Sequence, residues 1–119
     1  IQHPRKEGIV LGLLELEDEA VSTAGDYQRY FMKDGVRYHH ILDPQTLQPA
    51  RLSQSVTVVA KEGVLADGLD TGIFVMGPEK GMALLERLDE VEGVIVGQTG
   101  EIFISSGLQE RLQVTDQGQ

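Results

Sequence analysis

Hydrophobic and polar positions divide the chain into strand-like stretches toward its two ends and a helical stretch between them. Residues 9–16 form an apolar run, which predicts a mostly buried strand. Residues 20–26 predict a short strand followed by a turn. Two runs rich in aromatic and β-branched residues, 27–32 and 36–42, flank an Asp-Gly pair at 34–35, and this arrangement is typical of a β-hairpin.

The pattern becomes helical after residues 55–60, whose sequence Ser-Val-Thr-Val-Val-Ala predicts a further strand. Leucine, isoleucine and methionine recur at 65, 69, 73 and 76, at intervals of four or three, which predicts a helix with its apolar face there. Gly77-Pro78 ends this helix, and the proline suits the first turn of a second helix.

The C-terminal part returns to strands. A second hairpin is predicted from 91–96 and 101–105 around Thr99-Gly100, and the polar tail from Gln113 is expected to fray. The segregation of strands from two central helices predicts an α+β fold with a largely antiparallel sheet. The 119 residues can form one domain, and because the chain opens on Ile1 rather than Met we expect an excerpt of a larger catalytic domain.

Composition narrows the possible functions. The formal net charge of −9 argues against binding to nucleic acid, which needs a basic surface, and against attraction to anionic lipid. The absence of cysteine excludes disulfides and thiol catalysis. No signal peptide is visible, and no apolar run approaches the roughly 18 residues that a membrane-spanning helix requires. The net negative charge is typical of a surface that keeps a protein soluble, and it is compatible with a cation site.

Asp67 and Thr71 are the most informative pair. Residues four apart share one face of a helix, so this carboxylate and this hydroxyl can reach the same ligand. Mg²⁺ prefers oxygen ligands and takes one or two from protein beside substrate phosphates, so the pair indicates phosphate chemistry. The alternative is that Asp67 favours a helix N-terminus and Thr71 is an ordinary helical residue. Asp70 is expected to face solvent, and the alternative is that it supports a bound metal without binding it directly.

His40 and Asp43 lie at the end of a predicted strand, just before Pro44. Histidine has an ordinary pKa near 6.5, which suits a general base. From the residues alone, however, the pair His39-His40 is better explained by one side chain on each face of a strand, with no chemistry.

Five blocks of sequence follow one another along the chain. They are Ala-Val-Ser-Thr-Ala-Gly-Asp-Tyr at 20–27, Tyr-His-His-Ile-Leu-Asp-Pro-Gln-Thr at 38–46, Ser-Val-Thr-Val at 55–58, Ala-Asp-Gly-Leu-Asp-Thr at 66–71 and Phe-Val-Met-Gly-Pro-Glu-Lys-Gly at 74–81. In their order and spacing these blocks resemble the ApbE family of flavin transferases, and the resemblance covers nearly the whole chain. The resemblance is to the C-terminal part of the family's single domain, and it implies the same fold. The chain departs from the usual pattern at Ala24, where the family has serine, and at Leu47, where it has glycine.

The resemblance implies an enzyme that binds FAD and Mg²⁺ and transfers FMN to a threonine hydroxyl of an acceptor protein, releasing AMP. Acceptors in the family are subunits of Rnf or Na⁺-translocating NADH:quinone reductase complexes. Some members hydrolyse FAD to FMN and AMP, and a non-catalytic FAD-binding module is a further alternative. Most members are bacterial lipoproteins on the periplasmic side of the inner membrane, so membrane attachment is expected only through a lipid anchor outside this chain.

The resemblance also assigns roles to residues. Asp67 and Thr71 match the D-x-x-x-T motif that binds Mg²⁺. His40 matches the histidine of H-I-x-D-P, which implies contact with the flavin substrate and the role of general base, with Asp43 orienting it. Thr23, Gly25 and Asp26 are expected to contribute to cofactor binding through backbone amides in a turn. An ordinary turn is the alternative for these three residues.

Overall fold

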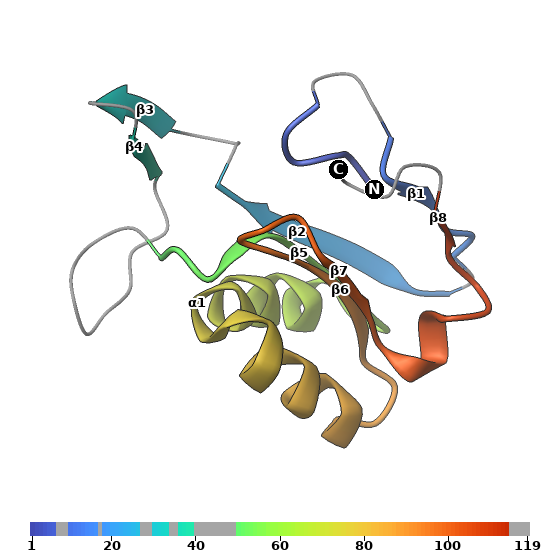
Figure 1. The fold of residues 1–119 in the computed structure, drawn as a ribbon. Helices are drawn as coiled ribbons and strands as arrows, with labels where there is room; N and C mark the ends of the chain where they lie inside the picture. The colour runs from blue at the N-terminus through green and yellow to red at the C-terminus, as the bar shows by residue number, and fades with distance from the viewer. Residues whose placement is uncertain (7–9, 17, 27–29, 34–35, 40–49, 115–119) are drawn as a thin grey trace.

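A four-stranded antiparallel sheet, packed on one face by a long helix, forms the centre of the computed structural model (Figure 1). The structure describes residues 1–6, 10–16, 18–26, 30–33, 36–39 and 50–114. The strands are β1 (Gly12–Leu13), β2 (Ala20–Gly25), β3 (Tyr30–Lys33), β4 (Val36–His39), β5 (Ser53–Ala60), β6 (Glu92–Gly97), β7 (Ile102–Ile104) and β8 (Gln113–Val114). The helices are α1 (Gly63–Arg87) and a short 3-10 helix, η1 (Ser106–Leu108).

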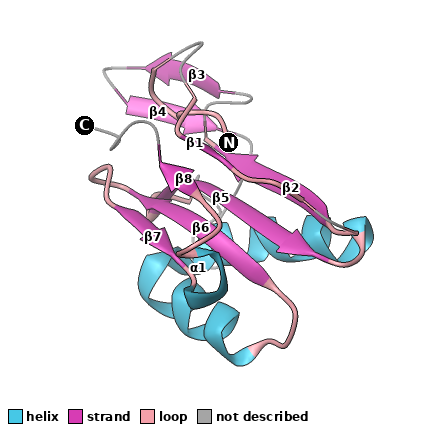
Figure 2. Ribbon diagram, turned by 90° about the vertical axis from the view of Figure 1, so that its right-hand side faces the viewer, coloured by secondary structure: helices cyan, strands magenta, loops and turns pink. Residues whose placement is uncertain are grey.

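The main sheet has the order β2-β5-β6-β7, with every neighbouring pair antiparallel. β5 is buried along almost its whole length because it lies inside the sheet with side chains packed on both faces. Figure 2 shows α1 behind this sheet, and the β3–β4 hairpin apart from it. The predicted strand at 55–60 and both predicted hairpins are confirmed.

α1 consists of two helical segments that meet at Gly77. Gly77 has φ 86° and ψ 173°, and Pro78 follows it inside the second segment. This agrees with the predicted break at Gly77-Pro78. Among the described residues, no helix is both long enough and apolar enough to cross a bilayer.

The face that α1 turns toward the sheet agrees only in part with the predicted one. Ile73 is buried and Leu69 packs against the core, whereas Leu65 and Met76 are 46% and 40% exposed. The buried positions of α1 are Ala66, Asp70, Ile73, Phe74, Gly77, Gly81 and Leu85. Small residues at several of these positions let the helix approach the strands closely. A Cβ at Gly81, for example, would lie 2.8 Å from side-chain carbons of both Ile73 and Ile95.

The N-terminal prediction of one strand over residues 9–16 was wrong. Of the described residues in this stretch, 10–16, only Gly12–Leu13 forms a strand, because its partner β8 is itself two residues long. Leu11 is buried in the core, whereas Leu13 and Leu16 are exposed. The expected fraying from Gln113 was also wrong at residues 113–114, which pair with β1.

Candidate functional site

Four polar side chains meet where α1 crosses β2. Ser22, from β2, donates a hydrogen bond from Oγ to Asp70 Oδ2 at 2.7 Å and lies 3.3 Å from Asp67 Oδ1. Thr71 donates from Oγ1 to Asp70 Oδ1 at 3.2 Å. We call Ser22, Asp67, Asp70 and Thr71 the carboxylate cluster. Both oxygens of Asp70 are therefore engaged by hydroxyl groups, one from the sheet and one from its own helix.

Burial differs sharply within the carboxylate cluster. Asp67 and Thr71 are exposed, as expected for residues that meet a ligand, but Asp70 is only 2% exposed. The expectation that Asp70 faces solvent was therefore wrong. It lies on the stripe of α1 that packs against the sheet, where Ser22 provides it with a hydrogen-bond donor.

The carboxylate cluster has no ion-pair partner among the described residues. Within the described part of the chain, neither Asp67 nor Asp70 forms an ion pair, and Ser22 and Thr71 are their only hydrogen-bond partners there. The helix dipole contributes little, because its effect is confined to the first turn and that turn contains no acidic residue. This weakens the alternative that Asp67 serves only as a helix-terminal charge.

The donor atoms of the carboxylate cluster fit a hard cation. Asp67 offers a carboxylate and Thr71 a hydroxyl whose proton is directed to Asp70, so that both present oxygen lone pairs from exposed positions one turn apart. No group of three or more His, Cys, Asp or Glu side chains able to hold a metal occurs among the described residues. A site with so few protein ligands suits Mg²⁺, which completes its coordination with phosphates and water.

The second predicted group, Thr23, Gly25 and Asp26, lies at the end of β2. Thr23 and Gly25 belong to the strand itself, so the predicted turn was wrong there, because the pairing with β5 continues to Gly25 opposite Ser55. The Asp26 amide donates to the Gln54 carbonyl at 3.0 Å, so it is already occupied. By the alternation of antiparallel pairing, the amides of Thr23 and Gly25 point away from β5 and toward the edge of the sheet.

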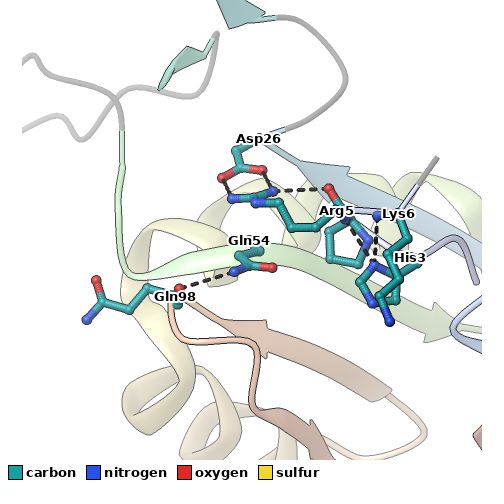
Figure 3. A network of polar contacts seen from close by, with 7 residues as sticks. His3, Arg5, Lys6, Asp26, Gln54 and Gln98 are labelled. Atoms are coloured by element: carbon teal, nitrogen blue, oxygen red, sulfur yellow. Dashed lines mark hydrogen bonds and ion pairs between the residues drawn. The ribbon is translucent and has the colours of Figure 1, made fainter. Parts of the chain in front are cut away.

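The Asp26 carboxylate is held by an arginine that sequence reasoning did not single out. Arg5 donates from Nη1 and Nη2 to the two oxygens of Asp26, both at 2.6 Å (Figure 3). Asp26 is 7% exposed, so this bidentate pair fixes the end of β2 to the N-terminal segment. Its carboxylate therefore has a protein partner before any ligand binds.

The structure does not bring the two predicted groups together through their side chains. Thr23 Oγ1 lies 3.0 Å from Thr57 Oγ1, whereas its neighbours Ser22 and Ala24 face α1. Because side chains alternate along a strand, Thr23 lies on the sheet face opposite the carboxylate cluster. His40 and Asp43, the predicted catalytic residues, lie outside the described residues, and their roles stay predictions.

Comparison with known proteins identifies the family of this chain. The ApbE family matches residues 1–95. The chain belongs to the ApbE family. A relative named FAD:protein FMN transferase, from Vibrio cholerae serotype O1, is 52% identical over 92 residues, which cover 76% of this chain and 27% of that protein.

Solved structures of the family agree with the fold. An ApbE protein from Thermotoga maritima matches with a TM-score of 0.82 and 41% identity, covering 91% of this chain and 35% of that one. The flavinyl transferase ApbE of Pseudomonas stutzeri, in its apo form, matches with a TM-score of 0.66 and 42% identity over 82% of this chain and 32% of that one. These matches confirm the predicted α+β fold. The chain spans about a quarter to a third of the length of these relatives.

Proposed function

We propose that this chain forms the cation-binding part of an FAD:protein FMN transferase. The carrying observation is the pair Asp67 and Thr71, exposed one turn apart on α1, where Asp67 has no ion-pair partner in the part of the chain that the structure describes. The activity named for the Vibrio cholerae relative supports the same assignment. The substrate is then FAD, and the acceptor is the threonine hydroxyl of another protein.

In this proposal, Asp67 and Thr71 hold Mg²⁺. The bound cation would neutralise charge on the pyrophosphate and on the leaving phosphate. The protein's own contribution is to hold two oxygen donors on one rigid helical turn, so that little reorganisation is needed when the pyrophosphate arrives. Thr23 and Gly25 would add backbone amides at the edge of β2, which are suited to phosphate oxygens.

The transfer itself exchanges the phosphoanhydride bond of FAD for a phosphoester bond to the acceptor protein. The acceptor threonine oxygen forms a bond to the FMN phosphorus, the pyrophosphate bond to the AMP phosphate breaks, and AMP leaves with the electron pair. The proton of the threonine hydroxyl passes to His40, which we propose as general base with Asp43 orienting it. We further propose that the acceptor is a subunit of the Rnf or Na⁺-translocating NADH:quinone reductase type, on the periplasmic side of a bacterial inner membrane.

The test follows fluorescent flavin on a denaturing gel. The protein, in the longest form that its gene encodes, is incubated with FAD, Mg²⁺ and a threonine-bearing acceptor domain, beside Asp67→Ala and the control Asp89→Ala. Asp89 is an exposed carboxylate just beyond α1. We expect a fluorescent acceptor band with the wild type and the control, and a loss of at least about 100-fold in Asp67→Ala, because losing a direct ligand should cost more than the roughly 10- to 100-fold typical of residues that only orient one.

Each remaining outcome decides against part of the proposal. A full-strength band with Asp67→Ala would remove Asp67 from the cation site. Consumption of FAD without a labelled acceptor would indicate hydrolysis to FMN and AMP. FAD binding with neither consumption nor labelling would indicate a binding module.

A further inference from the structure

Asp70 is the one acidic member of the carboxylate cluster that the proposed function leaves without a role. It is 2% exposed, and it accepts hydrogen bonds from Ser22 at 2.7 Å and Thr71 at 3.2 Å. It forms no ion pair within the described residues. A buried carboxylate with only neutral partners costs folding free energy, so a purely structural explanation is unfavourable here.

We propose that Asp70 is a positioning residue that prepares the Thr71 hydroxyl to bind a divalent cation. This inference rests on the proposed function, because it takes Thr71 as a ligand. Asp70 itself does not touch the cation. It acts through the orientation of its neighbour's proton and through its own negative charge.

The argument begins with the hydrogen-bonding capacity of a hydroxyl group. Thr71 Oγ1 has one proton and two acceptor lone pairs, and a cation can bind only on the lone-pair side. The hydrogen bond to Asp70 Oδ1 directs the proton into the protein, which leaves the lone pairs available on the exposed side. Without that acceptor the hydroxyl rotates freely, and some rotamers direct the proton toward the cation.

Ser22 orients the Asp70 carboxylate, as Asp70 orients the Thr71 hydroxyl. Its hydroxyl can donate only one hydrogen bond, and the shorter contact is with Asp70 Oδ2 rather than with Asp67 Oδ1. The bond ties the Asp70 side chain to β2 and leaves its other oxygen facing Thr71. The carboxylate charge also adds long-range attraction for a cation, and no described basic side chain forms an ion pair with it.

The test measures cation affinity directly, using Mn²⁺ as a paramagnetic substitute for Mg²⁺. Free and bound Mn²⁺ are counted by electron paramagnetic resonance with FAD present, for the longest form that the gene encodes. The variants are Asp70→Asn and Ser22→Ala, with Asp89→Asn as the control for loss of one carboxylate charge. Asn at position 70 keeps the shape, but its amide group would donate to one of the two hydroxyls instead of accepting from it.

We expect Asp70→Asn to weaken Mn²⁺ binding by about 10- to 100-fold, as is usual when a group that orients a metal ligand is lost. Ser22→Ala should give a smaller loss, and Asp89→Asn none. In the transfer assay, Asp70→Asn should raise the Mg²⁺ concentration needed for half-maximal rate, while saturating Mg²⁺ restores most of the rate. A purely structural role would lower the unfolding midpoint without this dependence on Mg²⁺.

Unchanged Mn²⁺ affinity in both Asp70→Asn and Ser22→Ala would overturn the inference. Absence of Mn²⁺ binding by the wild type would overturn it together with the cation site. If Asp70→Asn does not fold, Ser22→Ala decides alone, because it keeps both carboxylates and removes the hydroxyl whose shorter contact is with Asp70. Weakened Mn²⁺ binding in the variants, with no FMN transfer by any protein, would uphold the inference and reject the proposed function.

Discussion

Replacing Gly77 with alanine tests how the two segments of α1 are joined. Gly77 has φ 86° and ψ 173°, a backbone conformation that is almost restricted to glycine and costs about 1–3 kcal/mol for other residues. An added Cβ would also lie 2.8 Å from Leu52 Cβ and 2.9 Å from Leu52 Cδ1, and overpacking of this kind costs about 1–3 kcal/mol. Together these effects predict that Gly77→Ala lowers the free energy of unfolding by roughly 2–6 kcal/mol.

Urea unfolding followed by circular dichroism measures this loss. The midpoint should fall while the dependence of free energy on urea concentration stays unchanged, because the folded and unfolded surfaces are nearly the same. Gly72→Ala is the matched control on the same helix. A Cβ there meets nothing within 4 Å, so alanine should stabilise the helix by about 0.5–1 kcal/mol.

Stability equal to the wild type in Gly77→Ala would refute the reasoning. Combining Gly77→Ala with Leu52→Ala separates its two parts. The second change removes Leu52 Cδ1 but keeps Cβ and leaves the backbone conformation untouched, so much of the loss should persist. Full recovery in the double variant would show that the Leu52 side chain, rather than the backbone of Gly77, determines the cost.

Two further predictions concern the contacts that Ser105 and η1 make with β6 and α1. Ser105 is fully buried and its Oγ accepts a hydrogen bond from the Gly93 amide at 2.9 Å, so Ser105→Ala should cost about 1–3 kcal/mol in urea unfolding. Hydrogen bonds from the backbone amide and the hydroxyl of Ser106 hold the pKa of Glu86 below its ordinary value of 4.5. The stability they provide is therefore present above pH 4.5 and is lost as pH falls through the lower folded pKa. Glu86→Gln should show a smaller acid-induced drop in the urea midpoint than the wild type; an equal drop would contradict this assignment.

The main sheet could be predicted because its signals are local. Val-rich runs identified β5 and β6, and the Thr99-Gly100 pair identified the turn between β6 and β7. Gly100 has φ 89°, which explains why glycine is required in that turn. The break at Gly77 was predictable for the same reason, since glycine followed by proline interrupts a helix wherever it occurs.

The predictions that were wrong depended on partners distant in sequence. The apolar run at 9–16 has the composition of a strand, but the extent of β1 is limited by the two-residue β8 near the other end of the chain. The apolar face of α1 was predicted at large side chains, of which Ile73 is buried and Leu65 is exposed. The buried face also includes Ala66 and Gly81, because close packing against a sheet favours small residues that hydrophobic periodicity does not emphasise.

The same limit applies to the carboxylate cluster, and it explains why Asp67 and Thr71 were predicted but Asp70 was misjudged. A helix repeat is enough to place Asp67 and Thr71 on one face, whereas burial of Asp70 depends on Ser22, which lies 48 residues earlier in the sequence. Once β2 is known to cross α1, the alternation of side chains along the strand places Ser22 on the side that faces the helix. There it lies beside Asp70, the one charged residue among the buried positions of α1. A charged residue in such a stripe opposes folding, and sequences depart from local rules in this way mainly where a site requires it. Asp70, which the sequence analysis assigned to solvent, is therefore the residue whose replacement should be most informative about the cation site.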